Sequence, residues 1–288
     1  MKKYLADTTL NSTAITVITL FFTFVLIPSV ESVVGDEEIF LRASKYTVEI
    51  MTQIETPFID EAAGSFAGAG FLVDKSRGLI LTNAHVVKRS PSEVLVSFKN
   101  KDYRPVKKIY IDNYLDLAFV QIEPSEIPED KEEAKLECSN IPGIGHPVGA
   151  FGHPWFFPYT GTKGIISGIT DEYKGEQLQT DASINAGNSG GPLISLISGK
   201  VVGVNTSKFD DDKDQNTNFA EVMVYACRVF NLILEEKSPL PPELPFVYLN
   251  DPLKKIGLVV AKSYLKPGLI YIKAGDKIIE VIGHGAIK

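Results

Sequence analysis

The 288-residue sequence predicts an all-β protein. From about Ala43 to Cys227, short apolar runs rich in β-branched and aromatic residues alternate with glycine, proline, asparagine and aspartate. The runs recur every 10–20 residues or so, at roughly the spacing of strands in a β-barrel or sandwich. Few windows in this region have the 3.6-residue period of a long helix.

The expected strands follow one another along this region. They are AGFLVD (69–74), GLILTN (78–83), EVLVSF (93–98), KKIYID (107–112), LAFVQI (117–122), KGIISGI (163–169) and KVVGVNT (200–206). A helix is expected over 221–237, where the apolar positions approximate one face. Four prolines in 238–245 (SPLPPELP) then exclude a helix or a central strand, so we expect a linker there.

The amino terminus has the pattern of an export segment. Lys2 and Lys3 precede an uncharged stretch, and its apolar run 14–28 (AITVITLFFTFVLIP) is shorter than the ~20 residues of a membrane span. This pattern is typical of a secretory signal with a cleavage site near 30–32. A retained membrane anchor and a buried core helix are the alternatives. A signal or an anchor would place the mature protein outside the cytoplasm.

Charge and composition exclude some classes of function. The net charge is −7 and no dense Lys/Arg cluster is present, which argues against nucleic-acid binding. No Cys/His spacing resembles a metal site, so no bound metal is expected. In an exported protein, Cys138 and Cys227 could pair as a disulfide. Two buried thiols are the equal alternative.

GNSGGPL (187–193) contains a candidate nucleophile, Ser189. A serine hydroxyl attacks a carbonyl only when a neighbouring base takes its proton. The glycines allow backbone geometry that other residues resist, so the amides of Gly187 and Ser189 could point at one developing oxyanion.

Two other motifs supply a base and an acid. His85 follows an apolar strand in LTNAHVV, and Asp116 opens a later apolar strand in YLDLAFVQI. GNSGG also matches the nucleophile elbow of α/β hydrolases, in which the histidine follows the serine. Only His284 follows Ser189 here, and the chain lacks repeated βαβ units. The order His85, Asp116, Ser189 is that of chymotrypsin-type proteases.

Taken together, these motifs resemble the HtrA/Deg family of serine proteases over about 40–230. The resemblance rests on GSFAGAGFLVD (64–74), TNAHVV (82–87), LDLAFVQI (115–122), GIISGI (164–169), TDASINAGNSGGPL (180–193) and GKVVGVNT (199–206). It implies two six-stranded β-barrels of chymotrypsin type with the active site between them. It also implies His85 as general base and acid, Asp116 as its orienting group and Ser189 as nucleophile. The amides of Gly187 and Ser189 would form the oxyanion hole, with Asn188 shaping the turn.

The resemblance also implies a class of substrate and the residues of a substrate pocket. Substrates in the family are unfolded or misfolded proteins, and no cofactor is used. Ile184 would form the floor of an apolar substrate pocket, with Thr206, Ser207 and Lys208 along its wall. The family's residue after NFA is apolar, whereas this chain has Glu221, which leaves the cleavage preference open.

The carboxy-terminal segment GLIYIKAGDKIIEVIG (268–283) is similar to part of a PDZ module. The strands and final helix expected after 280–288 do not follow, so the segment is expected to be a partial PDZ-like unit. The expected organisation is a signal or anchor at 1–32, a protease domain at 33–237, a linker at 238–250 and the PDZ-like segment at 251–288.

HtrA-like proteases form trimers through the amino-terminal part of the protease domain, here 37–50 (EEIFLRASKYTVEI). Phe40 and Tyr46 are large rings that could anchor such a homotrimer. The alternative is that both rings pack on their own barrel.

Two other functions remain open beside quality control of unfolded proteins. One is a secreted processing protease of narrower specificity, against which the PDZ-like segment argues. The other is a non-catalytic protease-fold protein used for binding or as a chaperone, against which the three retained catalytic residue types argue.

Overall fold

The computed structural model describes residues 35–58, 61–153, 159–170, 176–206, 217–237, 239, 246–248 and 258–260. The predicted export segment 14–28, the pocket residues Ser207 and Lys208, and the PDZ-like segment 268–283 lie outside the described residues. Within these ranges, no helix is both long enough and apolar enough to span a membrane.

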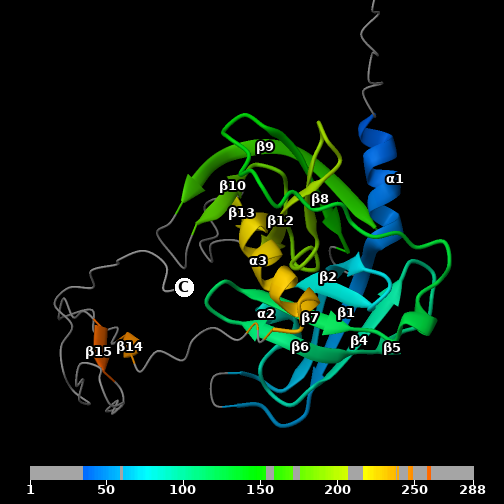
Figure 1. Cartoon of the computed structure of the whole chain (residues 1–288), viewed down its shortest axis with the longest axis vertical. Coiled ribbons are helices and arrows are strands. Elements are labelled where there is room, and N and C mark those ends of the chain that lie inside the picture. The colour runs from blue at the N-terminus through cyan, green and yellow to red at the C-terminus, as the bar shows by residue number, and fades with distance from the viewer. Residues whose placement is uncertain are drawn as a thin grey trace, which may run out of the picture. The chain divides into compact units, whose positions relative to one another are not determined.

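The amino-terminal half of the protease region is a seven-stranded antiparallel sheet, blue to green in Figure 1. Its strands are β1 (Thr47–Ile54), β2 (Gly64–Asp74), β3 (Leu79–Thr82), β4 (Glu93–Phe98), β5 (Arg104–Pro105), β6 (Lys107–Asp112) and β7 (Leu117–Gln121), in the order β5-β4-β1-β2-β3-β7-β6. The predicted six-stranded barrel is therefore replaced here by an open sheet. β5 is a two-residue edge strand, and its Pro105 has no N–H to donate to a further ladder.

The carboxy-terminal half is a closed six-stranded barrel, as the sequence predicted. Its strands are β8 (Pro147–Gly152), β9 (Thr160–Thr170), β10 (Gln177–Thr180), β11 (Pro192–Ser195), β12 (Val201–Thr206) and β13 (Asn218–Val222), closed in the order β10-β13-β12-β11-β8-β9. The barrel core includes Val148, Ile166, Leu178, Ile184, Leu193 and Val222.

α3 (Met223–Leu234) connects the two halves. Its ring Phe230 stacks on Phe119 of β7, with the ring centroids 6.0 Å apart and the planes 4° apart. The sequence predicted this helix over 221–237, and its first two positions instead complete β13. Cys227 of α3 forms a disulfide with Cys138, which decides the question that the sequence left open.

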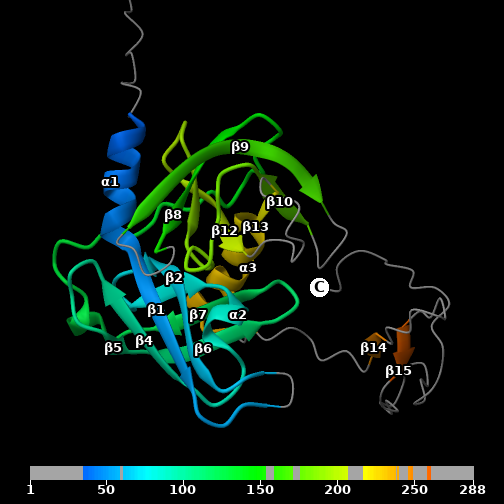
Figure 2. The same cartoon turned by 180° about the vertical axis from the view of Figure 1, so that it is seen from behind.

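α1 (Asp36–Tyr46) packs against its own chain, beside β8 and β9 in Figure 2. Its first turn carries three acidic residues, which interact favourably with the helix dipole. Phe40 lies over Gly149 of β8 and Gly161 of β9, and Tyr46 is only 5% exposed. Both rings thus pack on their own chain, which is the alternative to the trimer interface. The remaining described elements are α2 (Ala84–Val87), a 3₁₀ turn at Pro124–Glu126, and the short pair β14 (Phe246–Tyr248) and β15 (Leu258–Val260).

Candidate active site

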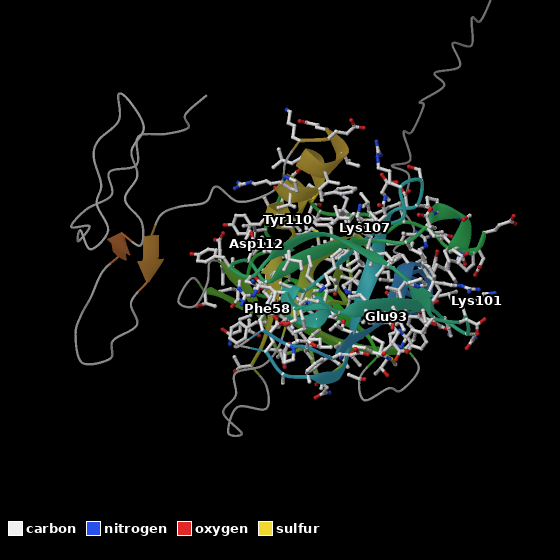
Figure 3. All side chains as sticks on the ribbon, turned by 90° about the horizontal axis from the view of Figure 1, so that it is seen from below. Phe58, Glu93, Lys101, Lys107, Tyr110 and Asp112 are labelled. Atoms are coloured by element: carbon white, nitrogen blue, oxygen red, sulfur yellow. A yellow bond between two sulfur atoms is a disulfide. The ribbon has the colours of Figure 1, made fainter. Side chains whose placement is uncertain are left out.

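The turn between β6 and β7 presents Asp116. Asp112 Oδ1 accepts hydrogen bonds from the amides of Tyr114 (2.9 Å) and Leu115 (3.0 Å). Its other oxygen accepts a 2.7 Å bond from the Tyr110 hydroxyl, and Figure 3 labels both side chains. These hydrogen bonds fix the shape of the turn. Asp116 has φ +49°, a left-handed conformation that aspartate tolerates better than most residues.

His85 is held against Asp116 by two hydrogen bonds. The His85 amide donates to Asp116 Oδ1 at 3.0 Å, and His85 Nδ1 lies 2.7 Å from Oδ2. Asn83 adds a bond from its Nδ2 to the Asp116 carbonyl at 2.8 Å. Since Nδ1–H donates to the carboxylate, Nε2 is left without a proton and can act as a base.

Thr206, at the end of β12, also contacts the Asp116 carboxylate. Its Oγ1 donates to Asp116 Oδ2 at 2.9 Å. The sequence analysis assigned Thr206 to the pocket wall and missed this contact. No local pattern signals it, because the two residues are 90 positions apart and come from different sheets.

The environment of Asp116 favours its ionised form. Burial raises the pKa of this carboxyl, but the hydrogen bonds and the charge of His85, together with the bond from Thr206, lower it by more. The resulting pKa lies below the ordinary value. An ionised Asp116 can therefore orient the imidazole and stabilise it when it becomes charged.

The loop that carries Ser189 is anchored on β2 and on β12. The Ala69 amide donates to the Ser189 carbonyl at 2.7 Å, and the Gly190 amide donates to the Asn205 carbonyl at 2.8 Å. Gly190 has φ +85°, and a Cβ there would lie 2.1 Å from the Ala69 carbonyl oxygen and 2.2 Å from Thr82 Oγ1. Only glycine fits this position, as the GNSGG motif suggested.

The same packing brings Ser189 beside the helical turn of His85. A Cβ on Gly68 would lie 2.7 Å from the Val86 side chain and 3.1 Å from the Ser189 carbonyl oxygen, so Gly68 separates the two segments. In the described part of the chain, the side-chain bond of His85 goes to Asp116, and none joins His85 to Ser189. Such a contact is often long in a resting protease and tightens when substrate binds.

The peptide between Gly187 and Asn188 is fixed from both ends. The Gly187 carbonyl accepts a 3.3 Å bond from the His153 amide, and the Asn188 amide donates to the Asn185 carbonyl at 2.9 Å. Gly187 has φ +101°, which suits glycine. The amides of Gly187 and Ser189 donate to no acceptor within the described ranges. Two such N–H groups beside a serine hydroxyl can bind an oxyanion.

The predicted pocket residues have different surroundings. Ile184 is 2% exposed and packs in the barrel core, so its part in a substrate pocket stays a prediction. The Glu221 side chain is 5% exposed and accepts a 2.5 Å bond from Gln177 Nε2 across the β10–β13 pair. Among the described side chains, no group of three or more His, Cys, Asp or Glu is arranged to hold a metal ion.

Comparison with protein families agrees with this geometry. Residues 68–204 match the trypsin-like peptidase domain. A probable periplasmic serine endoprotease DegP-like from Pseudomonas savastanoi is 37% identical over 146 residues, which are 49% of this chain and 29% of that protein. The serine endoprotease DegS of Escherichia coli K12 is 35% identical over 52% of this chain and 42% of that protein. Serine protease HTR4 of Rattus norvegicus is 37% identical over 53% and 32%. The chain thus spans less than half the length of these curated relatives.

Solved structures give the same result. The serine endoprotease from Yersinia pestis superposes with a TM-score of 0.57 and 28% identity, over 69% of this chain and 66% of that chain. The HtrA-type protease AlgW with a tripeptide gives a TM-score of 0.59 and 26% identity, over 69% and 64%.

Proposed function

Because the chain belongs to the HtrA/Deg family of trypsin-like serine proteases, we propose that it is a serine endopeptidase with His85, Asp116 and Ser189 as its catalytic residues. The observation that carries this proposal is the double contact of Asp116 with the amide and the Nδ1 of His85. A carboxylate held in this way fixes the imidazole ring in one orientation and one tautomer.

The proposed reaction proceeds through an acyl-enzyme. His85 Nε2 takes the Ser189 hydroxyl proton while Oγ attacks the peptide carbonyl carbon. The amides of Gly187 and Ser189 stabilise the oxyanion, and protonated His85 gives its proton to the leaving amine as the C–N bond breaks. Water, deprotonated by the same imidazole, then attacks the ester and releases the acid, and Ser189 regains its proton.

We propose unfolded or misfolded proteins as the substrates, and quality control of proteins as the role. The DegP-like relative from Pseudomonas savastanoi carries the word "periplasmic" in its name, which supports an extracytoplasmic location for this chain. The Cys138–Cys227 disulfide supports the same location, because disulfides persist in oxidising compartments. The pocket residues Ile184, Ser207 and Lys208 remain part of this proposal.

The domain organisation is likewise a proposal. It comprises a signal or membrane anchor at 1–32, the protease domain at 33–237, a linker at 238–250 and a partial PDZ-like segment at 251–288. A homotrimer is proposed by family resemblance alone, since Phe40 and Tyr46 pack on their own chain.

Ser189→Ala tests the activity directly. We expect casein hydrolysis to fall by a factor of about 10³ or more, because the nucleophile is removed. Only one oxygen is lost, so the free energy of unfolding should change by ~1 kcal/mol or less. Ser139→Ala, at an exposed serine, is the matched control and should keep full activity. Casein cleavage at the wild-type rate by folded Ser189→Ala protein would refute the proposal.

A further inference from the structure

Four aromatic side chains form a continuous stack from α1 to the loop that precedes Ser189. The ring centroids of Phe40 and Phe151 are 5.8 Å apart, those of Phe151 and Tyr159 5.4 Å, and those of Tyr159 and His153 4.3 Å. The first two contacts are stacked and the third is tilted, which are favourable geometries for aromatic pairs. We call Phe40, Phe151, Tyr159 and His153 the aromatic column.

Two glycines on adjacent barrel strands leave space for the Phe40 ring, which forms one end of the column. A Cβ on Gly149 of β8 would lie 2.6 Å from the Phe40 ring, and one on Gly161 of β9 would lie 2.9 Å from it. Phe151 pairs with Gly161 in the β8–β9 register. The column is therefore built into the wall of the barrel and does not simply lie on its surface.

The His153 end of the column contacts the loop that carries Gly187 and Ser189. His153 is 8% exposed, and its amide donates to the Gly187 carbonyl. With the bond from the Asn188 amide to the Asn185 carbonyl, this contact sets the plane of the peptide between Gly187 and Asn188. The direction of the two flanking amides, those of Gly187 and Ser189, depends on that plane.

Tyr159 also bonds to the other sheet. Its hydroxyl donates to the Thr47 carbonyl at the start of β1 (2.5 Å) and accepts from the Lys99 amide after β4 (3.0 Å). The Lys99 ammonium lies 5.3 Å from the centroid of the same ring. Burial raises the pKa of the Tyr159 hydroxyl, so it stays protonated and can donate at neutral pH.

These contacts matter because the proposed catalytic groups come from both halves of the molecule. His85 lies in α2 and Asp116 in the β6–β7 turn, both in the half that contains the open sheet, whereas Gly187 and Ser189 lie in the loop that connects β10 and β11 of the barrel. We propose that Tyr159 is a positioning residue for the oxyanion hole: its hydroxyl is bonded to the open sheet, and its ring holds His153 against Gly187. This inference rests on the proposed function and extends it.

The experiment compares Tyr159→Phe, which keeps the ring and loses both hydroxyl bonds, with Tyr159→Leu, which also removes the stacking. Tyr225→Phe is the matched control, because it loses a 2.7 Å hydroxyl bond to Glu176 and lies outside the column. We expect KM for a fluorogenic peptide to stay within about two-fold, while kcat falls roughly 3–10-fold in the Phe variant and 10–100-fold in the Leu variant. Losing a well-placed oxyanion donor costs about 10²–10³ in kcat, and displacing one should cost less.

Hydrogen–deuterium exchange gives a readout that does not depend on turnover. Peptides covering 185–191 should exchange faster in Tyr159→Leu than in wild type, and those covering 117–122 should not change. If the Leu variant does not fold, the Phe variant carries the kinetic test.

Wild-type kcat in both folded Tyr159 variants would overturn the inference, and so would a loss confined to KM or a loss of equal size in Tyr225→Phe. Unchanged exchange over 185–191 would overturn it as well. An inactive wild-type protein would instead refute the proposed function, and the exchange measurement would still decide whether Tyr159 fixes the loop.

Discussion

Thr206 and His85 share one oxygen atom of Asp116. Thr206 Oγ1 lies 2.9 Å from Asp116 Oδ2, and His85 Nδ1 lies 2.7 Å from the same atom. Thr206 ends barrel strand β12, whereas His85 lies in α2 and Asp116 in the β6–β7 turn of the other half. The bond thus joins the two halves at the carboxylate that orients the proposed base.

Thr206→Val should lower kcat/KM and shift the acid limb of the pH–rate profile. Valine has a similar shape but no hydroxyl, so Asp116 loses a donor that lowers its pKa, and that pKa should rise. We expect kcat/KM on a peptide substrate to fall by roughly 10-fold, since a hydrogen bond to a charged group contributes about 1.5–3 kcal/mol. The acid limb of the pH–rate profile should move to higher pH. Thr206→Ser keeps the hydroxyl and should restore both properties; an unchanged profile in Thr206→Val would contradict this role.

The protein should lose stability in acid. Burial raises the pKa values of Asp116, Asp74 and Glu61, but hydrogen bonds lower them by more, so all three lie below their ordinary values. A carboxyl with a lowered folded-state pKa contributes its full stability above the unfolded value of about 4 and loses it as the pH falls towards the folded value. Urea unfolding at pH 7, 5 and 3.5 should give nearly constant free energies at the first two and a lower one at the third. A free energy of unfolding that stays constant down to pH 3 would disprove this. Asp74→Asn should reduce the decrease in that free energy between pH 5 and pH 3.5.

Gly190→Ala should disrupt both folding and activity. The new Cβ would collide with backbone and with Thr82 at a positive φ, and neither neighbour is the far end of a flexible side chain. We expect a loss of about 3 kcal/mol or more in the free energy of unfolding, together with loss of casein hydrolysis. Gly143→Ala is the control, because a Cβ there meets nothing within 4 Å and should change stability by less than ~1 kcal/mol. Equal stabilities for the two variants would show that the close packing of the Ser189 loop is unimportant.

Removing the disulfide should lower the free energy of unfolding and leave the catalytic activity nearly unchanged. The bridge closes a loop between residues 89 positions apart, for which chain entropy gives an upper value of about 4–5 kcal/mol. We expect the Cys138→Ala/Cys227→Ala protein to unfold about 2–4 kcal/mol more easily, with kcat/KM within a few-fold of wild type below its melting temperature. Reduction of the wild-type protein should reproduce the shift. If neither treatment changes the unfolding midpoint, the bridge does not constrain the unfolded chain.

Local sequence pattern was enough to locate seven strands, namely β2, β3, β4, β6, β7, β9 and β12. The runs predicted at 93–98 and 107–112 coincide with β4 and β6, and the run at 117–122 exceeds β7 by one residue. Such runs can be read because a strand buries side chains by a short-range rule of alternation and composition. The glycine at position 190 follows a similar local rule, since a tight turn with positive φ favours a residue without a Cβ.

The order of the motifs also identified the family and the candidate residues His85, Asp116 and Ser189. The contact between His85 and Asp116 agrees with that expectation. The role of Ser189 as nucleophile stays a prediction, which the Ser189→Ala variant tests. The substrate pocket stays a prediction, because Ile184 packs in the barrel core and Ser207 and Lys208 lie outside the described residues.

The sequence by itself therefore determined seven of the strands and the turn glycines, and it supplied the candidate reactive residues, all of which depend on neighbours within a few positions. Only the tertiary structure decided that the first sheet stays open, that Cys138 meets Cys227, that Thr206 bonds to Asp116 and that Phe40 packs on the barrel. Each of these depends on residues far apart in the chain, and their free energy arises only when two complete elements pack together. A local pattern records which side chains are buried, but not which partner buries them.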